Sequence, residues 1–279
     1  MRNLLPLNGP AIAHYDSIAA VKHLDTRKLL KQLRPAVAQR YGAYLLAAPC
    51  LEQLPASSFS SKESEALKHC YDSETEPLSA LKMAIREQQD WVGRAYCAYC
   101  GINMCGTIEH YLPKAEFPEY AVCAYNLLPA CGDCNTAKGT NWLEEERRRL
   151  LHFYYDIIPD GVRWLHAIVE LVQDIPIVSF HLEQPKKLDA SFYRLVQDHY
   201  AALNLLERYA LCSVDVLSEA LSTAERYSNE PKLLQEALTI MAHSEAKRRG
   251  HNHWKVATLF GLASSPDFLE RACRGNVLL

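Results

Sequence analysis

Two short cysteine motifs constrain this chain more than any other feature. Cys97 and Cys100 form one C-x-x-C pair, Cys131 and Cys134 form a second, and thirty residues separate the pairs. A C-x-x-C turn brings two thiolates to one ion, and two such turns complete a closed tetrahedral zinc site. Because no ligand position stays open, the zinc is expected to be structural. The alternative is two unrelated cysteine pairs in a reduced protein.

The rest of the composition favours a metal site over disulfides. The chain has 279 residues, and its first residues show no sustained apolar stretch of the kind found in export signals. The longest apolar runs, such as 43–51, are too short to cross a bilayer. We therefore expect a cytoplasmic protein without membrane association, in which thiols stay reduced and bind metal.

The pattern along the chain predicts a mainly α protein with a small zinc-stabilised module inserted centrally. Cysteine, glycine, asparagine and proline concentrate between residues 96 and 142, too densely for a long helix or a regular sheet. Helical patterns lie on both sides. The expected domains are an N-terminal helical segment (1–93), the zinc module (94–142) and a C-terminal helical region (143–279).

Apolar spacing gives the individual helices. It predicts helices over 21–46 with a break or kink at Pro35, over 64–70 and over 77–93, and helical character again over 143–153. The stretch 162–182 fits either strands or a helix. From residue 190 onward we expect four or five helices, with breaks near Ser213, 229–231, Gly250 and 264–266.

Five further polar residues accompany the cysteine pairs: Glu109-His110 between them, Asn126 after these, Asn135 directly after Cys134, and then Lys138. Each has an ordinary explanation. A lone histidine packs, an asparagine after C-x-x-C caps a helix, and a lysine is solvated. Together, however, they stand in the order of the HNH endonuclease family, which residues 94–142 resemble. The family fold is a β-hairpin followed by a helix, the ββα-metal module.

The resemblance implies a role for each residue in phosphodiester hydrolysis. His110 would take a proton from the attacking water, and Asn126 would fix the catalytic loop or the imidazole tautomer. Glu109, where the family commonly has Asp, and Asn135 would bind one catalytic Mg²⁺ or Mn²⁺. Lys138 would contact a phosphate of the substrate.

A net charge of −3 argues against a strong freestanding binder of nucleic acid. The phrases I-E-H-Y-L-P-K and Y-N-L-L-P-A-C-G-D-C-N-T-A-K-G are most similar to PtuB-type HNH nucleases. These are effectors of bacterial Septu and retron anti-phage systems that act with a PtuA-type ATPase. The resemblance implies such a partner, with DNA as the expected substrate and RNA as an alternative. A stand-alone restriction or mobile-element nuclease and a non-catalytic zinc-binding adaptor remain open.

Two other motifs admit simpler interpretations. The tripeptide His251-Asn252-His253 spells the family letters, but the family residues are dispersed, so it is interpreted as a basic turn that is either solvated or in contact with phosphate. The run 144–149 (E-E-E-R-R-R) is expected to form ion pairs on an exposed helix.

Overall fold

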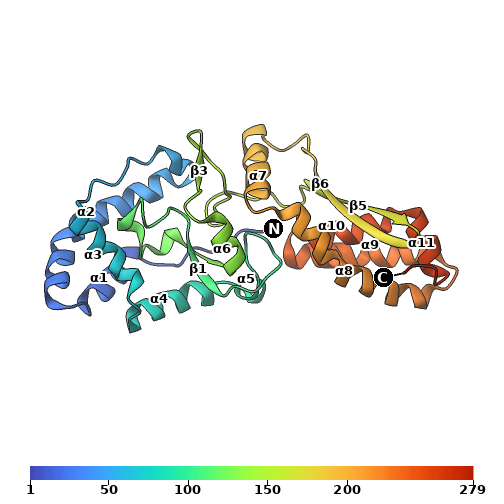
Figure 1. Ribbon diagram of the computed structural model, residues 1–279, viewed down its shortest axis with the longest axis horizontal. Coiled ribbons are helices and arrows are strands. Elements are labelled where there is room, and N and C mark those ends of the chain that lie inside the picture. The colour runs from blue at the N-terminus through green and yellow to red at the C-terminus, as the bar shows by residue number, and fades with distance from the viewer. Residues whose placement is uncertain (279) are drawn as a thin grey trace. The chain divides into compact units, whose positions relative to one another are not determined.

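The chain folds into two compact units in the computed structural model, which describes residues 1–278. The N-terminal unit comprises 3–99 and 103–157, and the C-terminal unit comprises 158–278 with the short pieces 1–2 and 100–102. Helices dominate both units and every sheet has two strands, which confirms the predicted mainly α class (Figure 1). The proposed division at residues 93 and 142 stays a prediction.

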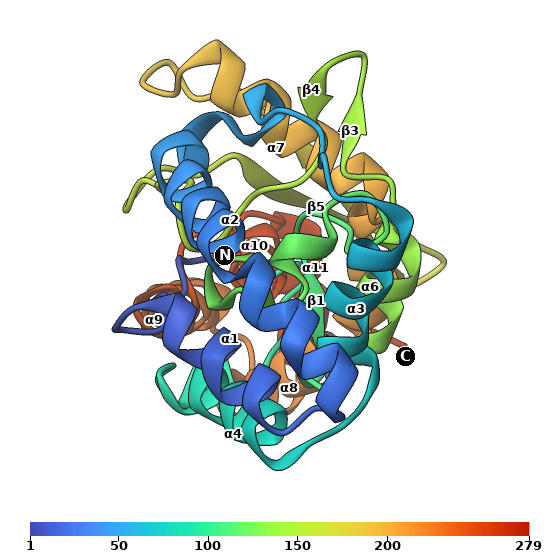
Figure 2. The same cartoon turned by 90° about the vertical axis from the view of Figure 1, so that its left-hand side faces the viewer.

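The first half of the N-terminal unit is helical (Figure 2). Its elements are α1 (Ala11–Ala20), α2 (Leu24–Ala47), the 3-10 helix η1 (Ala48–Gln53), α3 (Ser61–Asp72), α4 (Glu76–Glu87) and α5 (Trp91–Ala95). Ser60 starts α3 with a capping box completed by Glu63, and the Asp90 side chain caps α5. The helix α2 continues through Pro35, so the chain does not break there, because neighbouring packing outweighs one missing backbone bond; a kink at Pro35 stays a prediction.

A β-hairpin and a short helix follow. Strand β1 (Thr107–His110) pairs antiparallel with β2 (Leu127–Ala130), and the helix α6 (Gly132–Lys138) begins directly after β2. The 3-10 helices η2 (Pro118–Tyr120) and η3 (Ala124–Asn126) lie in the connection between the strands. The order of strand, strand and helix is the one expected for residues 94–142.

The helix predicted over 143–153 is wrong. Residues there form a small hairpin of β3 (Leu143–Glu144) and β4 (Arg147–Arg148). Both turn residues have positive φ, 47° at Glu145 and 61° at Glu146, which is the conformation of a type I′ hairpin turn. The E-E-E-R-R-R run therefore makes no helical ion pairs.

The C-terminal unit combines a hairpin with five α-helices among the described residues. Its elements are β5 (Leu165–Val172), β6 (Ile175–Leu182), α7 (Ala190–Ala202), α8 (Leu205–Ala224), η4 (Glu225–Tyr227), α9 (Pro231–Arg249), α10 (Trp254–Ala263) and α11 (Pro266–Cys273). Helix α10 packs on β5 and α8 packs on β6. The helices number as predicted, but the break near Ser213 is wrong: α8 runs through it, and the serine hydroxyl donates to the Ala210 carbonyl instead.

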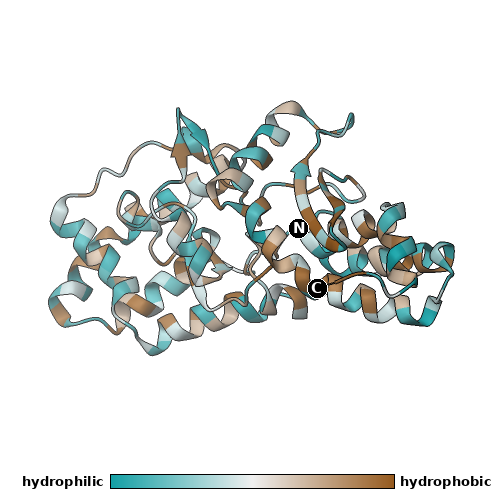
Figure 3. Cartoon of the chain, turned by 45° about the vertical axis from the view of Figure 1, so that its right-hand side comes forward, coloured by the Kyte–Doolittle hydropathy of each residue, from teal (hydrophilic) through white to brown (hydrophobic). Residues whose placement is uncertain are grey.

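Amphipathic helices build the cores. Figure 3 shows hydrophobic and hydrophilic residues alternating along the helical ribbons, as expected where one side of each helix is buried. In the N-terminal unit Tyr44, Leu78 and Ile85 are fully buried, and in the C-terminal unit Trp164 and Leu238 are. No helix within residues 1–278 is long and apolar enough to cross a membrane.

Candidate functional site

The four cysteines converge, as the spacing predicts. Their sulfur atoms all lie within 4.8 Å of one another, and all four residues are buried. Four sulfurs bonded to one zinc ion at ~2.3 Å would be about 3.8 Å apart, so this arrangement fits zinc. The Ile102 and Cys134 amides point at sulfur, 3.4 Å from Cys100 Sγ and 3.5 Å from Cys131 Sγ. The cluster can thus bind a structural metal such as zinc.

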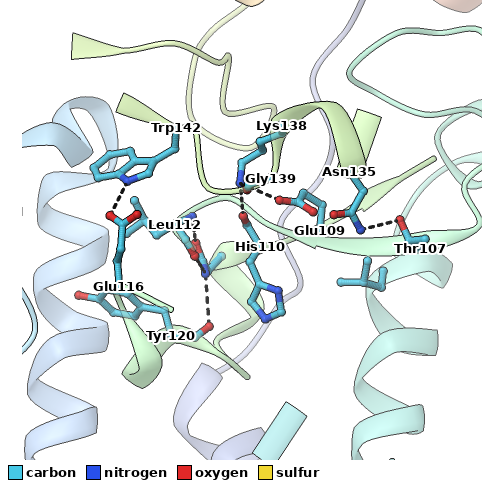
Figure 4. A network of polar contacts seen from close by, with 12 residues as sticks. Thr107, Glu109, His110, Leu112, Glu116, Tyr120, Asn135, Lys138, Gly139 and Trp142 are labelled. Carbon is cyan, nitrogen blue, oxygen red and sulfur yellow. Dashed lines mark hydrogen bonds and ion pairs between the residues drawn. The ribbon is translucent and has the colours of Figure 1, made fainter. Parts of the chain in front are cut away.

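The hairpin and α6 position the remaining candidate residues (Figure 4). In the antiparallel register Glu109 lies opposite Leu128, and His110 lies opposite Leu127 at the end of β1. Successive side chains of a strand point to opposite faces, so Glu109 points toward α6 and His110 points away from it. The structure therefore brings Glu109 together with residues of α6, while the imidazole lies on the other face of the hairpin.

His110 is buried and held in one orientation. Its Nε2 lies 2.9 Å from the carbonyl oxygen of Ala121, and the Tyr71 ring packs edge-on with 4.3 Å between ring centroids. A carbonyl only accepts hydrogen bonds, so Nε2 carries the proton and Nδ1 is the unprotonated nitrogen of the neutral ring. Burial lowers the pKa of His110 to about 3, although the bond to Ala121 opposes this shift. The imidazole is neutral across the physiological pH range.

Asn126 clamps the loop that follows His110. Its Oδ1 accepts from the Leu112 amide at 2.7 Å, and its Nδ2 donates to the Leu112 carbonyl at 3.0 Å and to the Tyr120 carbonyl at 3.4 Å. Its own backbone carbonyl accepts from Tyr111 N. Asn126 thus contacts the loop and not the imidazole. The residue is fully buried, so every one of these bonds is shielded from water.

Glu109 and Lys138 form a buried ion pair. Lys138 Nζ lies 2.7 Å from the Glu109 carboxylate and 2.7 Å from the His110 carbonyl oxygen, with the Gly139 carbonyl at 3.3 Å. The Lys138 side chain is 1% exposed and that of Glu109 is 6% exposed. Burial raises the pKa of Glu109 and lowers that of Lys138, and their mutual attraction opposes both shifts. Lys138 therefore meets a protein carboxylate where the sequence suggested a substrate phosphate.

Asn135 lies on α6, one turn before Lys138. Its Nδ2 donates to Thr107 Oγ1 at 3.3 Å, which fixes the amide plane beside the start of β1. The remaining amide oxygen and the Glu109 carboxylate are both hard oxygen donors of the type that Mg²⁺ prefers. Their chemistry fits a divalent cation, but Lys138 already supplies a positive charge to Glu109. A cation bound by Glu109 would have to share the carboxylate with that ammonium or displace it.

Sequence reasoning missed a buried polar network beyond residue 142. His152 is fully buried, and its Nε2 lies 2.9 Å from the hydroxyl of Tyr44 on α2. Arg148 forms a bidentate pair with Asp156 at 2.9 Å for both bonds. No motif spacing marks these residues. The cluster of aromatics at 152–155 was the one available signal, because such a cluster indicates a core rather than a solvated helix.

The tripeptide at 251–253 forms a turn at the start of α10, as expected, but its interpretation as a solvated or phosphate-contacting surface is wrong, because Asn252 and His253 are buried. Asn252 is 1% exposed, and its Oδ1 accepts from the backbone amides of Trp164 and Leu165. His253 is buried as well, and both it and Trp254 approach the Gly101 carbonyl at 3.1 Å. Asn252 therefore anchors the start of β5.

Fold and site together define a small hairpin-helix module with a four-cysteine metal cluster, embedded in helices. The chain is 28% identical over 189 residues to protein ea31 of Escherichia phage lambda, covering 62% of this chain and 63% of ea31. It is 34% identical over 71 residues to the Septu protein PtuB of Bacillus thuringiensis, covering 24% of this chain and 26% of PtuB. The matched parts thus span about three fifths of ea31 and about a quarter of PtuB. No family model matches the chain, and no solved structure matches it.

Proposed function

We propose that this chain is a metal-dependent HNH-type endonuclease that hydrolyses nucleic-acid phosphodiester bonds, most simply DNA, as the effector of an anti-phage defence complex. The similarity to a Septu protein supports the defence context. The order of strand, strand and helix beside the four-cysteine cluster supports the HNH module. The proposed cofactors are one structural Zn²⁺ and one catalytic Mg²⁺ or Mn²⁺.

One observation carries the proposal: His110 is a neutral imidazole with a defined proton acceptor. The Ala121 carbonyl holds the proton on Nε2, so Nδ1 is the nitrogen that can take a proton from water. The lowered pKa leaves the buried ring unprotonated at neutral pH, and it also makes the ring a weaker base than a free imidazole.

The adjacent residues supply the other parts of the chemistry. Glu109 and Asn135 would hold the divalent cation, which when bound stabilises negative charge on the phosphate and the leaving oxygen. Lys138 would contact that phosphate only after leaving Glu109.

The near-neutral net charge of the chain is the reason for proposing a partner subunit. A chain of net charge −3 has little long-range attraction for nucleic acid. We therefore propose that an ATPase subunit of the PtuA type holds or delivers the substrate. The isolated chain should bind DNA weakly at physiological salt and co-purify with the product of a neighbouring gene. Tight DNA binding by the lone chain would instead favour a stand-alone restriction or mobile-element nuclease.

A non-catalytic zinc-binding adaptor is the second candidate, and one observation favours it. The Glu109 carboxylate is already neutralised by Lys138 inside the protein, as in a purely structural ion pair. In that case neither Glu109 nor His110 would contact a substrate.

A nicking assay with Mg²⁺ or Mn²⁺, performed with and without the co-expressed partner, distinguishes the candidates. His110→Ala should abolish cleavage while zinc content and partner binding stay intact, since loss of a general base costs about 10²–10⁴-fold. Asn135→Ala should also reduce cleavage, and excess Mn²⁺ should partly restore it, whereas added metal cannot replace His110. Glu109→Ala should behave like Asn135→Ala if Glu109 binds the cation, and should reduce cleavage only mildly if the side chain points away from it. Cleavage by His110→Ala at the wild-type rate would leave the adaptor as the better interpretation.

A further inference from the structure

A chain of buried hydrogen bonds connects His152 to the loop that orients His110. His152 Nδ1 lies 3.4 Å from the backbone amide of Tyr154, and its Nε2 lies 2.9 Å from the Tyr44 hydroxyl. The same hydroxyl lies 3.2 Å from Asn126 Oδ1. Tyr44, Asn126 and His152 are each 0% exposed, so water does not compete for any of these bonds.

The hydrogen bond from the Tyr154 amide to His152 Nδ1 assigns this chain a direction. A backbone amide can only donate, so His152 Nδ1 is unprotonated and the neutral ring carries its proton on Nε2. Nε2 therefore donates to the Tyr44 oxygen. The single hydroxyl proton of Tyr44 is then available for Asn126 Oδ1, whose other bond comes from the Leu112 amide. The opposite tautomer of His152 would accept that hydroxyl proton and leave Asn126 without its second donor.

The neutral state of His152 suits this arrangement. Burial and the positive charge of Arg148 hold the pKa of His152 well below its usual range, although hydrogen bonds with the backbone of His152 and Tyr125 oppose this shift. A charged ring would carry protons on both nitrogens and would point one of them at the Tyr154 amide. His152 therefore acts here as a fixed neutral donor and not as a proton shuttle.

The chain ends on the groups that orient the candidate base. Asn126 Nδ2 holds the carbonyl of Tyr120, and the next residue supplies the carbonyl that binds His110 Nε2. Asn126 also holds Leu112, two residues after His110. Displacing the Asn126 amide would shift the loop on both sides of the imidazole.

We propose that Tyr44 and His152, from α2 and from the segment after the β3–β4 hairpin, are positioning residues that set the orientation of His110 through Asn126. This inference rests on the proposed nuclease function. It also means that the functional site includes residues before position 94 and residues after position 142.

The test uses the full chain and its partner, with Tyr44→Phe as the main variant. Tyr41→Phe is the matched control, because Tyr41 lies on the same helix, is also buried, and its hydroxyl has no hydrogen-bond partner among residues 1–278. Tyr44→Phe should lower kcat by about 10- to 100-fold with KM little changed, the usual cost of removing a group that orients a site residue. Tyr41→Phe should cut like the wild type.

A second pair of variants separates hydrogen bonding from packing. His152→Gln keeps a donor near the Nε2 position and should retain most of the activity, with the same pH profile. His152→Leu keeps a similar side-chain volume without the donor, so its kcat should fall as far as that of Tyr44→Phe. Equal activity of the Gln and Leu variants would overturn the proposal.

Two measurements keep the inference testable apart from cleavage. Nitrogen NMR of histidine-labelled protein should show His152 and His110 both protonated at Nε2 only. Amide exchange at Leu112 should speed up in Tyr44→Phe and stay unchanged in Tyr41→Phe. A proton on His152 Nδ1, or unchanged Leu112 exchange, would overturn the positioning role. A wild-type complex that passes both measurements but cuts nothing would instead refute the nuclease function.

Discussion

The buried pair of Lys138 and Glu109 allows a quantitative prediction, using the substitution Lys138→Met. Methionine has a similar length and no charge, so the change removes the ammonium and its three hydrogen bonds with little change in packing. It leaves the Glu109 carboxylate buried with no positive partner at hydrogen-bond distance. Breaking a buried pair in this way costs about 3–5 kcal/mol of unfolding free energy.

The electrostatic part of that cost has an upper limit. An uncompensated Glu109 can take up a proton, and the cost of doing so is about 1.36 kcal/mol for each unit between its ordinary pKa and the ambient pH. From the ordinary value of 4.5, the limit is about 3.4 kcal/mol at pH 7 and about 0.7 kcal/mol at pH 5. A carboxyl whose pKa is raised on folding stabilises the protein at low pH and loses that contribution as pH rises. The penalty of Lys138→Met should therefore grow with pH.

Urea unfolding of wild type and variant at pH 5 and pH 8 measures this dependence. The double variant Glu109→Gln/Lys138→Met should be more stable than Lys138→Met at pH 8, because it removes the stranded carboxylate. Lys114→Met is the matched control: Lys114 pairs with Asp72 at the surface, where the side chains are 34% and 49% exposed, so its loss should cost under about 1 kcal/mol. A penalty for Lys138→Met that is equal at both pH values would refute the reasoning.

Three further predictions concern the rest of the chain. Purified protein should hold one zinc ion per chain by metal analysis; Cys97→Ser or Cys134→Ser should give insoluble or partly unfolded protein, whereas Cys212→Ser, outside the cluster, should not. His110 and His152 have lowered pKa values, so their contribution to stability is present above pH 6.5 and is lost as pH falls. From pH 6.5 to pH 5 the unfolding free energy should drop by about 2 kcal/mol for each histidine. In urea titrations, His152→Gln should remove about half of this combined loss. Gly101 has φ of +66°, and a Cβ there would lie 2.9 Å from His253 Nε2. Gly101→Ala should therefore lower the unfolding free energy by about 1–3 kcal/mol in thermal melts. Gly106 has open space around it, so Gly106→Ala should cost under about 0.5 kcal/mol.

The cysteine cluster could be predicted because its information is local. Two C-x-x-C turns specify metal geometry whatever the surrounding chain does, and the four sulfurs do converge. The helix α3 was likewise predictable from apolar spacing, and α4 from spacing and Pro77 in its first turn, although the helix predicted over 77–93 ends at Glu87 and α5 begins at Trp91. In these segments, local preference and tertiary packing favour the same structure.

The hairpin at 143–148 could not be predicted, because there the two disagree. Three glutamates followed by three arginines favour a helix, and no Gly or Asn marks the turn at Glu145 and Glu146. The deciding interactions are distant. Arg148 reaches Glu52 at 3.0 Å and Asp156 at 2.9 Å, with its side chain 8% exposed. The helical preference of the run is small, and tertiary contacts of this kind routinely override it.

The same reasoning explains why the candidate site was only partly predicted. Spacing along the sequence placed Glu109, Asn135 and Lys138 in one region, but it did not indicate which of their polar groups would bond to one another. That depends on how α6 is oriented relative to β1, because this orientation brings Lys138 to Glu109 and Asn135 to Thr107. If the divalent site forms, the ion and the Lys138 ammonium compete for one carboxylate. Added Mn²⁺ should then stabilise Lys138→Met more than the wild type, since only the variant offers Glu109 unpaired. Equal stabilisation of the two proteins in thermal melts would place the cation elsewhere and remove Glu109 from the proposed ligands.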